Sequence, residues 1–200
     1  ILSTCYLGID DGYFDVAYKR IKLKHKTVLV GAVVCFDRFK DLYIELVTVD
    51  GLDALGSAFT ILEKSLSLYN IDAVFLDGVT YAGFNIVDPR KLYALGDTPI
   101  ITVFRHRLDL SKIYLALEKH FRDYRYRYEV IENIYSKSIE LELKHIPTTI
   151  RIHVLGMDIV RAKRVVIEQC KVFADPYPLR IADRVASLAG RLINRSLDLF

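Results

Sequence analysis

The sequence predicts an α/β fold in which one mixed sheet carries helices on both faces. Three β-favouring segments near the N-terminus are joined by short connections, a pattern typical of an antiparallel meander. The apolar period then changes from two residues to helical spacing. From there strands and helices alternate, which favours parallel strands linked by helices. The predicted order is β-β-β-α-β-α-β, followed by an extra hairpin and helices towards the C-terminus.

The first three predicted strands lie before residue 51. Residues 5–10 are apolar and β-favouring. The segment "TVLVGAVVCF" at 27–36 is almost wholly apolar, which predicts a central strand buried on both faces. "DRFKD" at 37–41 predicts a turn, and "LYIELVTVD" at 42–50 predicts the third strand.

The later elements follow from helical spacing and from helix-end signals. Large apolar side chains recur three or four positions apart over 53–69, which predicts an amphipathic helix. "DPRKLYALG" predicts a short helix at 88–96, because Pro lies near its start and Gly near its end. Asp109 or Ser111 is placed to cap a helix at 109–121. The remaining predicted elements are strands at 71–78 and 99–104, a hairpin of 138–143 and 149–155, and helices at roughly 158–173 and 178–195.

Length and composition favour a single domain covering residues 1–200. The chain is 52% hydrophobic and 26% charged, as globular proteins are, and it has no repeat or Gly/Ser linker. The net charge of +3 permits a polyanionic partner without requiring one. No apolar run approaches the ~20 residues that span a bilayer, and the first residues lack the basic region of a signal peptide. We therefore expect a cytoplasmic protein without membrane contact.

The cysteines and the overall residue usage bear on the environment of the protein. Cys5, Cys35 and Cys170 are widely spaced, each among apolar residues and outside any CxxC motif. An odd number at such spacing predicts buried thiols in a reducing cytosol. Abundant Lys, Arg, Glu, Ile, Val and Tyr beside a single Met and no Trp indicate a thermophilic source.

Two predicted strands end in carboxylates followed by glycine. "CYLGIDDGYF" at 5–14 reaches Asp10 and Asp11, and "VFLDGVTYAGFN" reaches Asp77. One Asp-Gly pair after a strand is usually a turn. Here the two pairs end the first and fourth strands, which are neighbours in a β-β-β-α-β sheet. Asp10 and Asp77 would repel each other unless one is protonated or a divalent cation lies between them, and Mg²⁺ or Mn²⁺ suits oxygen ligands of this kind.

A third acid is available in "VDGLDA". Asp50 ends the third strand and Asp53 opens the helix that follows. Each also has a structural explanation, Asp50 as a turn residue and Asp53 as a helix N-cap.

Four segments, "GIDDG", "DGVTYAGFN", "PIITVFR" and "PYPLRIADRVASLAGRL", carry a resemblance that covers nearly the whole chain. The sequence resembles an archaeal family of unknown function, number ninety-nine among such domain families, which is related to endonuclease V. The resemblance implies a ribonuclease H-like fold and a magnesium-dependent nuclease. It also implies that Asp10 and Asp77 match metal-binding aspartates, and that Arg105 stands where endonuclease V has a lysine near the scissile phosphate.

The sequence departs from endonuclease V at two motifs. "GFN" stands where that enzyme has His-Pro-Arg after its Asp-Gly, with Asn85 as its polar member. The Pro-Tyr-x-Pro wedge before the catalytic glutamate of endonuclease V is absent, so that "VTVDGLDA" offers Asp50 or Asp53 in its place. These departures favour the alternative that the chain binds nucleic acid without cutting it.

Three basic segments are candidates for contact with a polyanion. "KRIKLKHK" at 19–26 places lysines on one face of a strand, which also suits an edge strand that blocks association. "FRDYRYRYE" at 121–129 suits single-stranded nucleic acid, and it equally suits a helix with its tyrosines packed inward. In the last helix, Arg180 near a proline-set N-terminus would form a phosphate site if it faces the carboxylates, and Asp183 would add an acid or pair with an arginine. His106 is the histidine placed at a strand end.

These features predict a divalent-metal-dependent nuclease that hydrolyses phosphodiester bonds in DNA or RNA, including single strands. Asp10 and Asp77 would hold Mg²⁺ or Mn²⁺, with Asp11 and Asp50 or Asp53 completing the metal shell. Asp53 is also a candidate for the catalytic set. The side chains expected to contact phosphate or substrate are Arg105, Arg180, Asn85 and His106. The alternatives are a non-catalytic nucleic-acid-binding module and a structural subunit with no affinity for nucleic acid.

Overall fold

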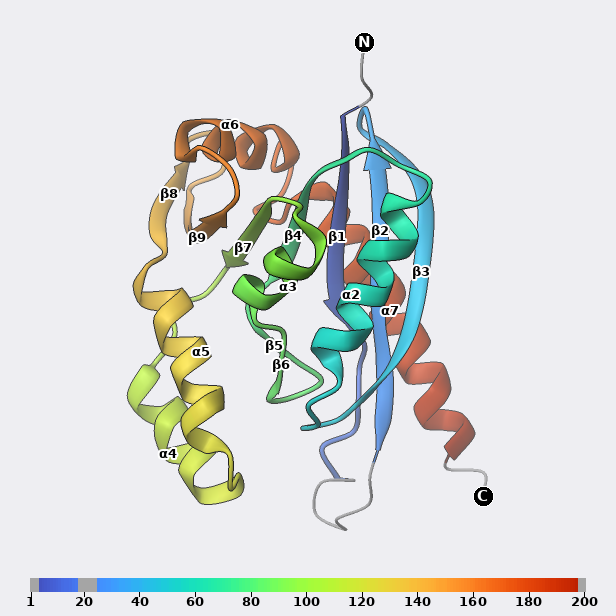
Figure 1. Ribbon diagram of the computed structural model, residues 1–200, viewed down its shortest axis with the longest axis vertical. Helices are drawn as coiled ribbons and strands as arrows, with labels where there is room; N and C mark the ends of the chain where they lie inside the picture. Colours follow the sequence, from blue (N-terminus) through green and yellow to red (C-terminus); the bar gives the residue numbers. More distant parts are fainter. Residues whose placement is uncertain (1–3, 18–24, 198–200) are drawn as a thin grey trace.

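The computed structural model describes residues 4–17 and 25–197 and contains a seven-stranded mixed sheet (Figure 1). The strand order is β3-β2-β1-β4-β7-β9-β8. β1, β4 and β7 are parallel to one another, while β2 and β3 on one side and β9 and β8 on the other pair antiparallel. The predicted mixed α/β sheet of the ribonuclease H-like type is confirmed. The strands of this sheet are β1 (Cys5–Asp11), β2 (Lys26–Cys35), β3 (Arg38–Thr48), β4 (Ile71–Asp77), β7 (Ile100–Phe104), β8 (Ile139–Leu143) and β9 (Thr148–Leu155).

Helices cover both faces of the sheet, as Figure 1 shows. α2 and α3 lie over one face, α7 and α6 pack on the other, and α4 and α5 form a pair beside the end of β7. A two-stranded sheet of β5 (Thr80–Tyr81) and β6 (Asn85–Ile86) follows β4. No helix in the described part of the chain is long and apolar enough to cross a membrane. The helices are α2 (Ala54–Leu66), α3 (Pro89–Gly96), α4 (Leu110–His120), α5 (Tyr124–Ser136), α6 (Ile159–Gln169) and α7 (Tyr177–Leu197).

The central strands are apolar on both faces because each face carries its own core. Leu7 and Ile9 of β1 pack in the cluster that includes α2 and α3. Tyr6 of β1 and Phe75 of β4 point to the opposite face, into the cluster that includes α6 and the start of α7. The two rings meet edge to face, with centroids 5.8 Å apart. Burial on both faces explains why these strands are continuous apolar runs in the sequence.

The connection between β2 and β3 is shorter than the sequence predicts. Phe36 and Asp37, with φ angles of 51° and 57°, form the whole turn, so that β3 begins at Arg38. The prediction of a turn over 37–41 is therefore wrong in extent. Two consecutive residues with positive φ give a type I′ hairpin, for which Asn-Gly is the usual signal. Phe-Asp does not carry that signal.

Two of the three basic segments predicted as polyanion contacts lie in or next to the elements described so far. The predicted hairpin arm at 19–26 lies mostly outside the described residues, and Lys26 is the first residue of β2. "FRDYRYRYE" enters α5, and Arg127 is its buried cation. Arg127 Nη1 donates to the carbonyls of Gly51 (3.0 Å) and Phe84 (2.5 Å), so this arginine holds α5 against the loops near β6.

The cysteine prediction is wrong for two of the three residues. Cys5 and Cys35, which face each other in the β1–β2 pairing, form a disulfide with a Cα–Cα distance of 4.1 Å. Cys170 is a buried free thiol, as expected. Sequence separation concealed the pairing, because 30 residues separate two cysteines that the hairpin topology brings together.

Candidate active site

Asp10 and Asp77 end neighbouring parallel strands at the same level of the sheet. The β1–β4 register pairs Ile9 with Leu76, so the residue after each is an aspartate at the strand end. Side chains alternate along a strand. Asp10 therefore shares the face of Tyr6, and Asp77 that of Phe75, which is the face that α7 covers.

α7 lies directly on the backbone of β1 along this face. A Cβ atom on Gly8 would lie 2.3 Å from the carbonyl carbon of Pro178, and one on Gly12 would lie 2.6 Å from the carbonyl oxygen of Ala186. The two glycines therefore allow a helix-to-strand approach that any other residue would block. Asp183 lies on α7 between these two contact points, and its charge raises the pKa of each of the three strand-end aspartates.

The carboxylates at this end of the sheet are destabilised in their charged form. Asp10 is 7% exposed, and burial followed by the charges of Asp77 and Asp11 raises its pKa well above the ordinary value. Burial raises the pKa of Asp11 to about 7. Burial also raises the pKa of Asp77, against the opposing effect of Arg105. Such a cluster is stabilised by a proton or by a cation.

Arg105, directly after β7, pairs with Asp77. Its Nη2 donates to Asp77 Oδ2 and its Nε to Oδ1 (3.3 Å), while Nη1 lies 3.5 Å from Asp175 Oδ1. Asp10, in contrast, has no ion-pair partner among the described residues, and its Oδ1 accepts the backbone N–H of Asp11 at 2.8 Å. The two carboxylates therefore differ in their partners. Arg105 neutralises Asp77, whereas Asp10 has no such cation among the described residues.

The donor set fits Mg²⁺ or Mn²⁺ in chemistry. Mg²⁺ keeps several waters and needs one or two protein carboxylates, and Asp10 and Asp77 provide two oxygen donors side by side. Within the described residues no group of three His, Cys, Asp or Glu side chains is arranged to hold a metal. A third protein ligand would therefore require side-chain rearrangement, above all at Arg105.

The other predicted acids hold the loop that carries β5 and β6. Asp11 Oδ2 accepts the N–H of Ala82 at 2.7 Å. Asp50, at a φ of 57°, accepts the N–H of Phe84 at 2.9 Å. Asp53 accepts from Thr48 through both its N–H and its hydroxyl, the latter at 2.7 Å, and these bonds help to lower its pKa. The structure thus engages Asp50 and Asp53 as loop-holding groups.

Asn85, expected to contact substrate, is fully buried and has its amide engaged within the fold. Its Oδ1 accepts the N–H of Ala54 at the start of α2 (3.0 Å). Its Nδ2 donates to the Thr48 carbonyl (2.9 Å) and to Asp53 Oδ1 (2.6 Å). The side chain therefore joins β6 to the end of β3 and to the first turn of α2.

Arg180 does not lie beside the carboxylates. Its guanidinium carbon lies 4.5 Å from the ring centroid of Phe173, and the side chain lines a small hollow with Asp37. Asp37 belongs to the β2–β3 turn, which adjoins the start of β1, so this hollow and Asp10 lie at opposite ends of that strand. The condition for the predicted phosphate site at Arg180 is not met.

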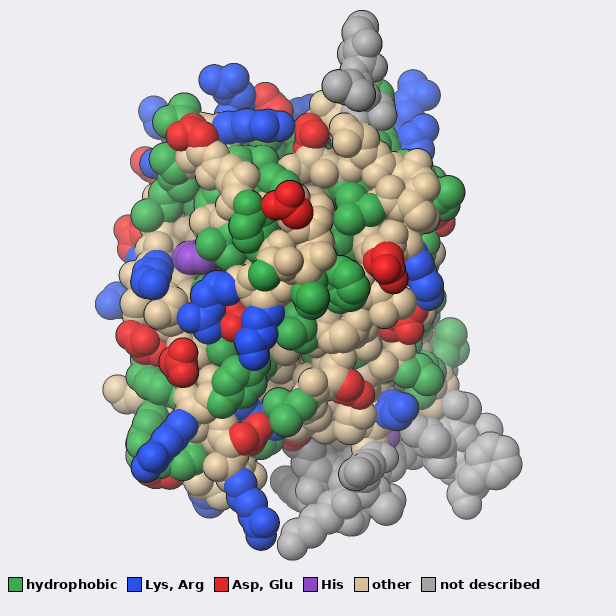
Figure 2. Space-filling view, viewed as in Figure 1, with side chains coloured by type: hydrophobic (Ala, Val, Ile, Leu, Met, Phe, Trp, Pro, Cys, Tyr) green, Lys and Arg blue, Asp and Glu red, His purple; other side chains and the backbone are tan. Residues whose placement is uncertain are grey.

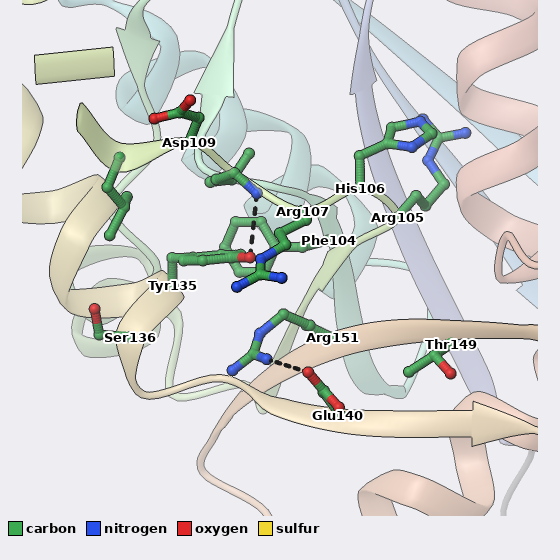
Figure 3. Close-up of a pocket in the computed structure, with 12 residues that line it drawn as sticks. Phe104, Arg105, His106, Arg107, Asp109, Tyr135, Ser136, Glu140, Thr149 and Arg151 are labelled. Atoms are coloured by element: carbon green, nitrogen blue, oxygen red, sulfur yellow. Dashed lines mark hydrogen bonds and ion pairs between the residues drawn. The ribbon is translucent and has the colours of Figure 1, made fainter. Parts of the chain in front are cut away.

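Two hollows adjoin Arg105, and the smaller of them is also lined by Asp77. The smaller, of about 210 Å³, is lined mostly by apolar side chains, Phe84 and Phe104 among them, and also by Asp77 and Thr80. The larger, of about 860 Å³, is shown in Figure 3. His106 lines both, and its side chain is exposed. The predicted His106 therefore lies at the junction of the two hollows.

The sequence did not single out three residues of this region. Asp175, the second partner of Arg105, precedes "PYP", where an aspartate signals only a turn. Arg107 and Arg151 line the larger hollow from elements that are far apart in the sequence. The "RHR" run at 105–107, directly after a buried strand, was a signal that could have drawn attention to Arg107.

Comparison with known proteins agrees with this architecture. A UPF0215 protein from Thermococcus gammatolerans is 35% identical over 183 residues, covering 90% of this chain and 89% of the relative. A UPF0215 protein from Methanosarcina acetivorans is 34% identical over 182 residues, covering 90% and 88%.

Among solved structures, a protein of unknown function from Archaeoglobus fulgidus superposes with a TM-score of 0.76 at 26% identity, covering 94% of this chain and 98% of that one. Endonuclease V from Ciona intestinalis, in complex with a 24mer DNA containing an inosine followed by a ribo-adenosine, superposes with a TM-score of 0.61. Its identity is 12% over 98% of this chain and 87% of that one, so this likeness concerns the fold. The model of the family described as Endonuclease dU matches residues 3–189. The chain therefore belongs to the endonuclease dU family, whose fold is that of endonuclease V.

Proposed function

We propose that this protein is a divalent-metal-dependent endonuclease that hydrolyses a phosphodiester bond in DNA or RNA. The observation that carries the proposal is the pair of buried carboxylates, Asp10 and Asp77, at the ends of adjacent parallel strands. In open α/β sheets, ligands bind outside the carboxyl ends of such strands. The family description and the endonuclease V fold support the same activity class.

In this proposal Asp10 and Asp77 hold Mg²⁺ or Mn²⁺. The ion would supply Lewis-acid stabilisation of the phosphoryl oxygens and activation of the attacking water. Asp11 would keep its bond to Ala82, which fixes the loop that borders the small hollow. Asp183 would contribute negative charge from α7, strengthening the attraction for a cation.

Arg105 is proposed to exchange partners when substrate binds. It pairs with Asp77 in this structure, and a phosphate approaching that carboxylate would offer the guanidinium a second anion of suitable bidentate geometry. Transfer of Arg105 from Asp77 to the phosphate would free the carboxylate for the metal. The same motion would neutralise negative charge on the phosphate, which electrostatic catalysis requires.

The small hollow beside Asp77 is proposed to accept one unstacked base. Enzymes that act at a particular base commonly turn it out of the helix into a pocket of apolar and aromatic walls. Phe84 and Phe104 provide such walls within 12 lining residues that also include Asp77. The family description indicates deoxyuridine as the base-containing unit to test first, and inosine is the comparison that the endonuclease V fold suggests.

The test is cleavage of end-labelled oligonucleotides that contain deoxyuridine, inosine or neither, with Mg²⁺, Mn²⁺ or a chelator. Asp10→Asn and Asp77→Asn should each lower the rate roughly 100-fold or more, because several kcal/mol of charge stabilisation are lost. Asp158→Asn is the matched control, since Asp158 caps α6 and asparagine caps equally well.

The rival function, a binding module without catalysis, is favoured by the Arg105–Asp77 pair and by the lack of a ready three-acid group among the described residues. Binding that is equal with metal and with chelator, together with no product from any substrate, would support the rival. Cleavage that survives both aspartate variants would refute the metal assignment.

A further inference from the structure

The larger hollow extends from Arg105, beside the proposed catalytic centre, to the end of α5 and the β8–β9 hairpin (Figure 3). It shares Phe104, Arg105 and His106 with the small hollow that reaches Asp77. Its far walls come from the end of α5 and from the β8–β9 hairpin, which supplies Glu140, Thr149 and Arg151. Its volume of about 860 Å³ lies in the upper part of the range for ligand pockets and exceeds what a single phosphate fills.

Arg151 is held rigidly on one wall. Its Nε donates to Ser138 Oγ (2.9 Å), its Nη2 to the Ser138 carbonyl (2.6 Å) and its Nη1 to Glu140 (2.8 Å). The guanidinium also lies 5.2 Å from the ring centroid of Tyr135. A cation fixed in this way loses little side-chain entropy when an anion binds.

Arg107 is the uncompensated charge of the hollow. It is exposed and makes no ion pair or hydrogen bond with any residue in the described ranges. The two acids of the lining are each engaged, Asp109 with Lys112 (3.3 Å) and with the first turn of α4, and Glu140 with Arg151. The positive charge of Arg107 is thus left available for an anion.

The face of the molecule shown in Figure 2 does not present a general field of positive charge that would explain anion binding. On the face shown in Figure 2, basic and acidic side chains are interspersed, consistent with a net charge of only +3. Affinity for a polyanion would then depend on local sites where cations are left unpaired.

We propose that this larger hollow binds the sugar–phosphate segment that flanks the cleavage point, with Arg107 contacting a phosphate and with Arg151 and Tyr135 forming part of the lining. The inference rests on the proposed function, since it takes the strand to run from Asp77 into the hollow. Phosphate contacts of this kind position a strand without reading its sequence. The shared ligand chemistry is a phosphodiester, and inorganic phosphate is the simpler source that the test separates from a nucleic-acid strand.

The test is fluorescence anisotropy with a labelled single-stranded oligonucleotide, in chelator, over a series of salt concentrations. Arg107→Gln should weaken binding several-fold and reduce the slope of log K against log salt by about 0.7, the value for one phosphate contact on a single strand. Arg164→Gln is the matched control, because Arg164 is another exposed arginine without a partner in the described residues, and it lies on α6. The control should leave both quantities unchanged.

The outcomes separate the proposed endonuclease activity from the proposed flanking site. Equal behaviour of the two variants, or no binding by the unaltered protein, overturns this inference. If cleavage is observed while Arg107→Gln binds like the unaltered protein, the endonuclease stands and the flanking site fails. If no substrate is cut but the Arg107-dependent binding is present, the endonuclease fails and the site stands. If inorganic phosphate binds as tightly as the oligonucleotide, the hollow is a phosphate site and the strand assignment is overturned.

Discussion

Asp10 shows how a residue suited to a metal weakens the fold that carries it. Its carboxyl is buried, has no cation beside it among the described residues, and faces the charges of Asp77 and Asp11. Because its pKa in the folded state lies above that in the unfolded chain, the Asp10 carboxyl contributes to the stability of the fold only while it is protonated. Stability from this group is therefore complete below the ordinary value of 3.8 and is lost as pH rises towards the folded-state pKa.

The first prediction is that Asp10→Asn stabilises the metal-free protein at pH 8 and not at pH 4. The amide has the shape of the protonated acid and carries no charge to bury. We expect a rise of a few degrees in Tm at pH 8, the size of change that about 1 kcal/mol produces in a chain of this length. Thermal unfolding in chelator at the two pH values measures it, with Asp158→Asn as control. A variant that is less stable than the unaltered protein at pH 8 would contradict the assignment of Asp10 as a buried, repelled carboxylate.

At the residue scale, the sequence predicted which acids lie at the strand ends but not what each of them contacts. Asp10 and Asp77 follow from apolar runs that stop at an acid, since adjacent parallel strands end together. The pairing of Arg105 with Asp77 depends on side-chain direction across two strands, and the position of Arg180 depends on where along β1 the helix α7 begins. Neither is encoded in a local pattern.

At the scale of elements, the segment around β5 and β6 is fixed by side chains from β1, β3 and the start of α2. Asp11, Asp50 and Asn85 each provide one of these links. The sequence assigned the first two to a metal shell and the third to substrate. All three assignments took a polar residue near an Asp-Gly motif as functional, whereas a short segment with two residue pairs of sheet also needs partners for its other backbone groups.

The second prediction distinguishes these roles for Asn85. Asn85→Ala should lower the free energy of unfolding by roughly 2–4 kcal/mol, because it removes a buried amide and leaves the Ala54 N–H and Thr48 carbonyl without that partner. Urea unfolding is the measurement, and Asn70→Ala, at an exposed position, should change little. If Asn85→Ala instead keeps its stability and loses affinity for oligonucleotide, the role in substrate binding is the correct one.

At the scale of the molecule, the mixed main sheet was predictable because its central strands are apolar runs and the helices that link them, such as α2, are amphipathic. The strands β5 and β6 were not predicted. The disulfide was not predictable, because the odd number of cysteines and their apolar surroundings favoured free thiols. Cys5 and Cys35 become neighbours only through the β1–β2 register. Intracellular proteins of hyperthermophilic archaea are an exception to the rule that cytosolic proteins lack disulfides, so the expectations of a thermophilic source and of a cytoplasmic location do not conflict with this bond.

The last prediction concerns this bond and the distance between it and the proposed active site. The disulfide closes a loop with a sequence separation of 30, and a cross-link of that size stabilises a protein by about 3.6 kcal/mol in the chain-entropy description. Reductant should therefore lower the denaturation midpoint of the unaltered protein, and it should have no effect on a variant carrying Cys5→Ala and Cys35→Ala. Cys170→Ala, which removes the free thiol, should respond to reductant as the unaltered protein does.

Nuclease activity, measured well below the unfolding temperature, should survive reduction. Cys5 and Asp10 are five residues apart on one strand, a span of about 17 Å, and the β1–β2 ladder continues between them. A midpoint that does not move with reductant, together with three reactive thiols in the unfolded oxidised protein, would show that the bond does not form. A large loss of activity on reduction, with the fold unchanged, would instead show that the two ends of β1 are coupled. The prediction that activity does not depend on the disulfide would then be wrong.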